Sequence, residues 1–288
     1  MGILKRILVA TDFSVRSDRA VRRAVLLARQ TGAALSLVHV VDDDQPRRIV
    51  ESEFGMASQL LEEQAKTLES VDGVSCHAEV RLGDAFAGIL AAGREQRPDL
   101  LVVGPHRRKL LRDVFIGTTA ERIIRNSEWP VLMANAPPVG PYRNVLLASD
   151  LSDGALMAAK HFAALDLAPQ ARLSALHVFD APALGLGMSH SMSRDQKDRY
   201  LEGMRDEAVM GMADFVRSLN IKAVEEMVRR ETSSPAHDIL AAAHEAGAGL
   251  VVVGSCGRNG IEKMVLGSVA EELLRVADVD VLVIPSAA

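Results

Sequence analysis

Short apolar runs alternate with longer stretches of helical periodicity along the first half of the chain. Most of the runs are continuously apolar, as expected for parallel strands that helices cover on both faces. Their alternation predicts an α/β domain with a doubly wound, five-stranded parallel sheet. The expected strands lie at 6–10, 35–41, 74–81, 99–104 and 130–134, and the expected helices near 17–30, 50–70, 85–96 and 118–126.

The first expected helix indicates which of its faces is buried. Its alanines and valines recur at three- and four-residue spacing, which predicts an apolar stripe against the sheet and a polar face in water. The stripe consists of Ala20, Val21, Ala24, Val25 and Ala28, and the arginines expected in solvent are Arg19, Arg22, Arg23 and Arg29.

The second half of the chain repeats the first. The segment T-D-F-S around Asp12 recurs as S-D-L-S around Asp150, 138 positions later, whereas Gly104 recurs as Gly254, 150 positions later. The second copy therefore holds about twelve additional residues between these two motifs. A repeat of this length predicts two tandem domains with the same fold.

The expected domains cover residues 1–136 and 142–288, and the segment A-P-P-V-G-P between them indicates a short, stiff linker. The last strand of each copy, at 130–134 and at 279–285, is expected at a sheet edge, and an apolar edge needs cover. We therefore expect these strands to pair within the chain and to give an intramolecular pseudo-dimer. The sequence leaves open whether two such chains form a homodimer.

A glycine-rich turn follows the fourth strand of the second copy and leads into a helix. Glycine allows the backbone to approach a ligand closely, and the free N–H groups at a helix N-terminus bind phosphate. This arrangement predicts a phosphate cradle. The residues expected to line it are Val253, Gly254, Gly257, Gly267, Ser268 and Val269.

Three more residues of the second copy are expected at the same edge of the sheet. Ser149 and Asp150 follow its first strand, and Val178 ends its second. Ligands of doubly wound sheets bind beyond the carboxyl ends of the strands. A carboxylate there suits ribose hydroxyls and an apolar strand end suits a base, so a nucleotide is the expected ligand.

These motifs together resemble the universal stress protein family. The resemblance rests on a glycine pattern, G-x-x-G followed after nine residues by G-S. It also rests on S-D-x-S after the first strand of the second copy and on L-H-V at the end of its second strand. The resemblance covers both halves of the chain. It implies the adenine-nucleotide alpha-hydrolase-like fold and, in the second half, ATP together with Mg²⁺. The ATP contacts that the resemblance implies are Asp150, Val178, Gly254, Gly257, Gly267, Ser268 and Val269.

The first copy carries an altered version of the same motif. Arg107 replaces the second glycine, so that a side chain stands where the backbone would approach phosphate. The guanidinium could instead bind phosphate itself. We expect this half to be the weaker site, and its equivalent residues are Asp12, Val40, Gly104, Gly117 and Thr118.

Composition narrows the function classes. A net charge of −5 without a long basic run argues against nucleic acid as a partner. No apolar run reaches the roughly 18–20 residues of a membrane span, and the N-terminus does not resemble a signal peptide. Cys76 and Cys256 form no metal-ligand pattern and suit a reducing compartment, so we expect a cytoplasmic protein.

Catalytic motifs are not recognisable in the sequence. There is no Gly-Lys pair of a P-loop and no nucleophile elbow, so no catalytic residue or metal ligand is assigned. His39 and His177, near the ends of equivalent strands, are interpreted as structural. Residues 181–212 are rich in methionine; they are interpreted as an ordered loop and an amphipathic helix, or else as a mobile cover or apolar contact surface.

By this resemblance the chain is expected to be a tandem universal stress protein that binds ATP in its C-terminal half and acts as a nucleotide-dependent sensor or regulator. Binding does not imply turnover, because fast hydrolysis needs a placed metal, an oriented water and charge stabilisation. Weak ATPase activity or autophosphorylation is the most we expect. Two alternatives stay open: a chaperone-like or scaffold protein that needs no nucleotide, and a slow ATP hydrolase.

Overall fold

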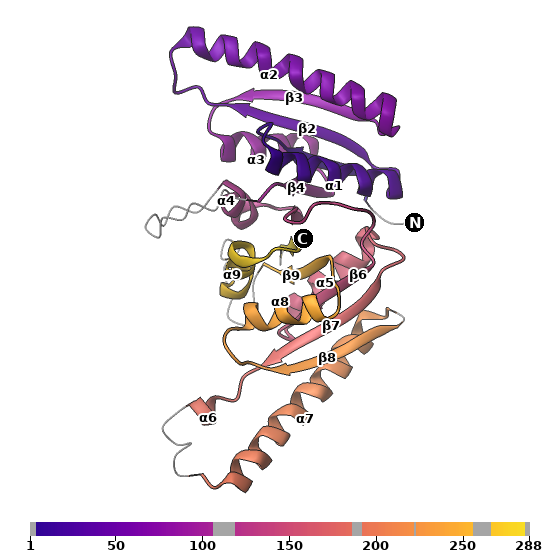
Figure 1. Ribbon diagram of the computed structural model, residues 1–288, viewed down its shortest axis with the longest axis vertical. Helices are drawn as coiled ribbons and strands as arrows, with labels where there is room; N and C mark the ends of the chain where they lie inside the picture. Colours follow the sequence, from indigo (N-terminus) through magenta and orange to yellow (C-terminus); the bar gives the residue numbers. More distant parts are fainter. Residues whose placement is uncertain (1–3, 106–118, 186–191, 222, 256–265, 286–288) are drawn as a thin grey trace.

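A single mixed sheet runs through the molecule along its long axis (Figure 1). The computed structural model describes residues 4–105, 119–185, 192–221, 223–255 and 266–285. In this part of the chain the sheet has ten strands in the order β3-β2-β1-β4-β5-β10-β9-β6-β7-β8. The two halves therefore lie side by side, with their last strands in the middle.

Each half alternates strands and helices as the sequence predicts. The first half contains β1 (Arg6–Ala10), α1 (Val15–Thr31), β2 (Ala34–Val41), α2 (Arg47–Thr67) with a π-helical turn η1 (Leu68–Asp72), β3 (Cys76–Leu82), α3 (Ala85–Gln96), β4 (Leu100–Val103), α4 (Thr119–Asn126) and β5 (Val131–Met133). The second contains β6 (Asn144–Ala148), α5 (Asp153–Leu165), β7 (Arg172–Phe179), α6 (Pro182–Gly185), α7 (Arg194–Leu219), β8 (Val224–Arg230), α8 (Pro235–Glu245), β9 (Leu250–Gly254), α9 (Ser268–Val276) and β10 (Asp280–Ile284).

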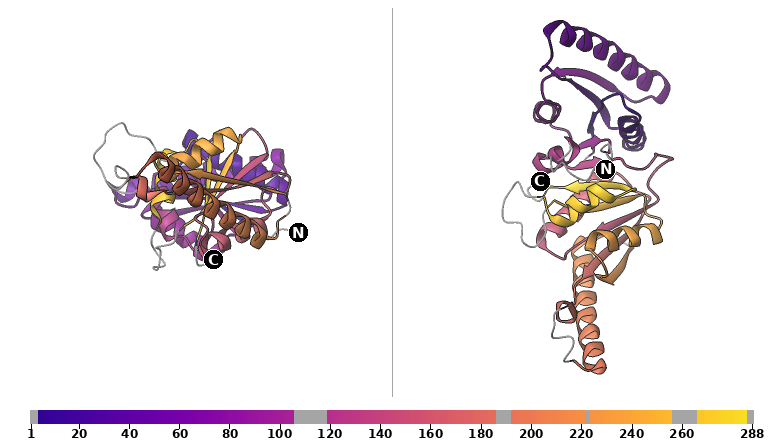
Figure 2. Two further views of the ribbon diagram at one scale, coloured as in Figure 1. Left: turned by 90° about the horizontal axis from the view of Figure 1, so that it is seen from below. Right: turned by 60° about the vertical axis from the view of Figure 1, so that its left-hand side comes forward.

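Strand pairing within each half is parallel throughout the described residues, which confirms the doubly wound, five-stranded arrangement. Helices cover both faces of the sheet (Figure 2). One apolar core lies under α1, α2, α5 and α7, and the other lies under α3, α4, α8 and α9. Burial on both faces explains why the strands are continuously apolar.

Equivalent serines start equivalent helices in the two halves. The Ser14 hydroxyl accepts a hydrogen bond from the Ser17 N–H at 3.3 Å, and the Ser152 hydroxyl accepts one from the Ala155 N–H at 3.2 Å. Such N-caps satisfy backbone donors that the first helical turn leaves unpaired. At its other end α1 stops at Gly32, whose φ of 75° only glycine adopts without strain.

The two halves are joined by antiparallel pairing of β5 with β10, so the expected pairing of the closing strands is confirmed. Both strands are buried, and each covers the edge that the other would expose. The paired residues are Val131 with Val283, Leu132 with Leu282, and Met133 with Val281.

The expectation that Arg23 lies in solvent is wrong. Its side chain is 6% exposed, and its Nε donates to Oδ2 of the fully buried Asp280 at 2.8 Å. Its Nη1 donates to the Gly140 carbonyl, and its guanidinium lies 4.2 Å above the Tyr142 ring. The periodicity of α1 describes the core of its own half, whereas Arg23 is buried by the linker and the other half.

The methionine-rich segment leads into the predicted amphipathic helix, α7, which continues to Leu219. Met212 on the inner side of this helix is fully buried, whereas Met210 on its outer side is 64% exposed. Residues 186–191, before this helix, lie outside the described part of the chain. Among the helices that the structure describes, none combines the length and the apolar character of a membrane span.

Candidate functional site

The topology of the second half predicts a ligand crevice at the carboxyl ends of β6 and β9, and this edge of the sheet is called the crevice here. The chain leaves β6 toward β7 on one side and leaves β9 toward β10 on the other, so these neighbours form a topological switch point. Ligands of doubly wound sheets bind there, beyond the carboxyl ends of the strands. Continuing the β6–β7 register puts Asp150 level with Val178. The β6–β9 register puts Ser149 level with Gly254.

Asp150 is held firmly in the turn that starts α5. Its Oδ1 accepts hydrogen bonds from the N–H of Ser152 at 3.1 Å and from the Ser152 hydroxyl at 2.6 Å. Leu151 between them has a left-handed φ of 64°, and its N–H donates to the Ser149 hydroxyl at 3.0 Å. The half-buried carboxylate is therefore fixed at the edge of the crevice.

The histidine of the second strand supports this turn. His177, 8% exposed, places its Nδ1 2.9 Å from the carbonyl oxygen of Ser149, the residue before the acid. In the first half His39 places its Nδ1 2.8 Å from the carbonyl of Thr11. A carbonyl oxygen only accepts, so Nδ1 carries the proton in both. These contacts agree with the structural role that the sequence predicts.

The two ends of the glycine turn meet beside the crevice. The Gly267 N–H donates to the Ser255 carbonyl at 2.7 Å, and the Ser255 N–H donates to the Ile284 carbonyl at 2.8 Å. Gly254 and Gly267 are therefore brought close together at the end of β9. Residues 256–265, which include Gly257, lie outside the described residues.

The N-terminus of α9 is the part of this edge best suited to an anion. Gly267 is its N-cap and offers no side chain, whereas Ser152 and Ser234 cap α5 and α8. The first N–H groups of α9, including those of Ser268 and Val269, have no side-chain cap. A helix start of this kind carries a partial positive charge and free donors, and both favour phosphate.

Acidic residues gather on the other side of the crevice, near the ends of β7 and β8. Burial raises the pKa of Glu231, and the neighbouring charges of Asp180 and Asp238 raise it further. Asp238 is buried and accepts hydrogen bonds from the N–H and hydroxyl of Thr232 at 2.8 and 2.6 Å. Burial opposes its ionisation, but these bonds hold the pKa of Asp238 below its usual value. These acidic side chains would repel a phosphate. A phosphate is therefore expected on the opposite side of the crevice, at the N-terminus of α9.

The sequence reasoning missed Asp238 and the contact that ties α8 to α9. The Ser234 hydroxyl donates to Glu272 of α9 at 3.1 Å, and His237 lies 3.3 Å from the same carboxylate. In the first half Asp84 takes the place of Ser234 and Arg122 the place of Glu272, and these two side chains lie 3.6 Å apart. The only signal in the sequence is the capping motif S-P-x-x-D. It predicts that a helix starts at this position, but it does not predict that Asp238 binds Thr232 or that Ser234 binds Glu272.

Asp12 in the first half repeats the geometry of Asp150 with more exposure. Its Oδ1 accepts from the Ser14 N–H at 3.0 Å. Partial burial raises the pKa of Asp12, but hydrogen bonds from Ser14 and Ser17 and the charge of Arg16 outweigh it, and the pKa falls below its usual value. The carboxylate therefore stays ionised at neutral pH.

Two other first-half residues of the predicted site are engaged in packing. A Cβ on Gly104 would lie 2.9 Å from the Arg16 carbonyl oxygen, so this glycine is required by the approach of α1. Val40 lies against Gly88 of α3, where an added Cβ would come within 2.8 Å of its methyl group. Arg107, Gly117 and Thr118 lie outside the described residues, so the altered glycine motif stays a sequence prediction.

Comparison with known proteins agrees with the repeat. The model of the universal stress protein family matches residues 4–135 and again residues 141–285. A universal stress protein of Mycolicibacterium smegmatis is 26% identical over 299 residues, which cover 96% of each chain. One from Methanocaldococcus jannaschii is 32% identical over 144 residues, 47% of this chain and 85% of that protein. The crystal structure of a universal stress protein from Archaeoglobus fulgidus superposes with a TM-score of 0.69 at 21% identity, over 99% of both chains.

Proposed function

Because this chain belongs to the universal stress protein family over both of its halves, we propose that its second half binds ATP and that the protein acts as a nucleotide-dependent regulator in a stress response. The observation that carries the proposal is the convergence of Asp150, Val178 and Gly254 with the uncapped start of α9 at one switch point. The absence of a membrane-spanning helix in the described residues is compatible with the cytoplasmic location that we expect.

The charges at the crevice suggest how the nucleotide lies. The adenine would contact Val178, and the ribose hydroxyls would meet the Asp150 carboxylate. The phosphates, with Mg²⁺, would lie against Gly254, Gly267 and the first N–H groups of α9, away from the acids near β8. Val253 and Ser149 support the floor of this site, because they lie at the ends of the strands that form it.

Binding is favoured over turnover in this proposal. The Asp150 carboxylate already accepts two hydrogen bonds from Ser152, so it suits the positioning of a ribose better than the transfer of a proton. We expect at most slow phosphate release. A release assay on wild type and on Asp150→Ala measures this: rapid release that the substitution abolishes would favour the hydrolase alternative.

Calorimetry with Mg-ATP tests the binding site. We expect one nucleotide per chain, and Asp150→Ala should weaken binding about tenfold or more, corresponding to at least ~1.4 kcal/mol. The matched control is Asp12→Ala, which removes the equivalent acid of the first half and should change the affinity little. Gly257→Arg copies Arg107 of the first half and should also weaken binding.

Three results would contradict the proposal. Wild type that binds no nucleotide would leave the scaffold or chaperone-like alternative. Equal losses in the Asp12 and Asp150 variants would remove the difference between the two halves. An unchanged affinity in Gly257→Arg would remove the role of the glycine turn. Thermal melting of each variant separates a lost contact from a lost fold.

A further inference from the structure

Strand β8 forms the outer edge of the described sheet and pairs with β7 alone among the described strands. It lies at the far end of the molecule from β3, the other outer strand (Figure 1). The Glu231 N–H donates to the Phe179 carbonyl of β7. Hydrogen-bonding direction alternates along a strand, so Glu226 and Val228 direct their backbone groups away from β7. An edge of this kind is a template for another strand.

The order of charges along β8 suits one particular strand, namely β8 of a second copy. Met227 packs toward the α8 side of the sheet and Val228 toward the α7 side, so Glu225 and Arg229 share the face of Met227. Two β8 strands can pair antiparallel about a twofold axis at Met227. Glu225 of each copy then lies opposite Arg229 of the other. Opposite charges placed this way attract, and like charges repel.

Neighbouring registers lose this complementarity. A twofold axis at Glu226 would place that carboxylate opposite its own copy. An axis at Val228 would place Glu226 opposite Arg230 of the second copy, but it would also place Glu225 opposite Glu231. The register centred on Met227 therefore opposes Glu225 to Arg229 without bringing like charges together.

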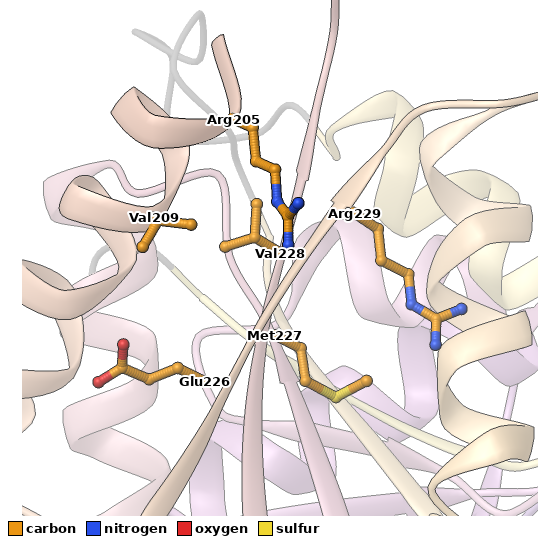
Figure 3. A pocket seen from close by; sticks show the side chains of 6 residues that line it. All are labelled: Arg205, Val209, Glu226, Met227, Val228 and Arg229. Atoms are coloured by element: carbon orange, nitrogen blue, oxygen red, sulfur yellow. The ribbon is translucent and has the colours of Figure 1, made fainter. Parts of the chain in front are cut away.

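A cavity beside β8 supplies a second complementary contact. It measures about 460 Å³ and is lined by Arg205 and Val209 of α7 and by Glu226, Met227, Val228 and Arg229 of β8. In Figure 3 the side chain of Arg205 extends to Val228. In the self-paired register Val228 faces Glu226 of the second copy, so Arg205 would meet that carboxylate.

Helix α7 would cover the paired β8 strands on one face of the sheet. It packs over β7 and β8, and Val209 on it is 44% exposed. The N-terminal end of α7 extends past β8 along the long axis of the molecule (Figures 1 and 2), so this helix would lie over the edge of the second copy. Val209 would then be covered by the second copy.

We propose that two copies of this chain associate through antiparallel pairing of β8 with β8, centred on Met227. The molecule already uses antiparallel pairing to join its halves at β5 and β10. The outer strand β3 is the matched comparison, because Arg81 pairs with Glu95 there as Arg229 pairs with Glu245. In β3, however, Glu79 occupies the position of Met227, so the equivalent register would bring two carboxylates together.

Sedimentation across a concentration series tests the association. Glu225→Arg would put arginine opposite Arg229 and should raise the dimer dissociation constant at least about tenfold. Adding Arg229→Glu to it reverses both charges and should restore association. His77→Arg, at the equivalent position of β3, should change nothing. Wild type that stays monomeric at all concentrations, or a dimer that Glu225→Arg leaves intact, would overturn the proposal.

A cysteine at the twofold axis tests the register separately from stability. Residues opposite each other in a non-hydrogen-bonded antiparallel pair have Cα atoms about 4.5 Å apart, which a disulfide spans. In a Cys256→Ser background, Met227→Cys should give a covalent dimer under mild oxidation, whereas Glu79→Cys in β3 should stay monomeric. Equal cross-linking of the two variants would refute pairing through β8.

Discussion

Gly104 shows how one residue can fit a ligand motif and still be fixed by packing. The backbone of α1 occupies the space that a side chain would need: a Cβ would lie 2.9 Å from the Arg16 carbonyl oxygen and 3.1 Å from the Ser17 Cα. Neither neighbour is a side chain that can rotate away. A glycine at this position is therefore required whether or not the first half binds a nucleotide.

Gly104→Ala should consequently destabilise the fold. We expect a loss of about 1–3 kcal/mol in the free energy of unfolding, because overpacking forces the backbone to shift. Gly55→Ala is the matched control: nothing lies within 4 Å of its added Cβ, and it is inside α2. There alanine should stabilise by about 0.5–1 kcal/mol. Urea unfolding measures both, and an equal effect of the two substitutions would contradict the packing argument.

Elements were predictable from the sequence where their signals are local. The strands are continuously apolar, and Ser14 and Ser152 mark helix starts by their own hydrogen bonds. For the candidate site, the sequence predicts which strand ends and which glycines take part. It can do so because the internal repeat and the order of the strands determine where these positions lie. The contact between Ser234 and Glu272 joins residues 38 positions apart, and no periodicity encodes it.

Helix α8 depends on a buried acid that is absent from the first half. Asp238 accepts from both the N–H and the hydroxyl of Thr232 and so holds the strand end against the first helical turn. Asp238→Ala would leave these donors unpaired and should cost about 1–3 kcal/mol of unfolding free energy at pH 7. Asp43→Ala, which removes an exposed acid, should cost much less.

The stabilisation by Asp238 should also depend on pH. Its folded pKa lies below its usual value, so the stabilisation is present above the unfolded pKa and is lost as the pH falls through the folded one. The gap between wild type and Asp238→Ala should therefore narrow in acid. Urea unfolding from pH 7 down to pH 3 tests this, and a constant gap would contradict the role of the charge.

At the scale of the whole molecule, the joint between the halves is asymmetric. The Tyr142 hydroxyl donates to Oδ2 of Asp280 at 2.6 Å, the Ala136 N–H donates to its Oδ1 at 2.9 Å, and Arg23 completes the cluster. The repeat places Leu4, Pro130 and His161 at the positions equivalent to Tyr142, Asp280 and Arg23. The polar cluster therefore lies on one side of the pseudo-twofold axis and distinguishes the two halves.

Removal of Arg23 should weaken this joint strongly at neutral pH. Arg23→Met keeps the volume but leaves the Asp280 carboxylate buried without its cation, which should cost about 3–5 kcal/mol. His161→Met, at the equivalent position of α5, should cost much less, because His161 is half-buried and is no part of this cluster. Urea unfolding of both variants at pH 7 measures the difference, and similar losses would contradict the role of the cluster.

The loss in Arg23→Met should diminish as the pH falls. Burial raises the pKa of Asp280, although Arg23, Tyr142 and the Ala136 N–H lower it in part, so removal of the guanidinium raises it further. A carboxyl group with a raised folded pKa contributes stability below its unfolded pKa, and that contribution is lost as the pH rises through the folded value. In acid Asp280 takes up a proton and needs no cation. Unfolding at pH 4.5 should therefore show a smaller difference from wild type than unfolding at pH 7, and an equal or larger difference would contradict an ionised Asp280 as the source of the loss.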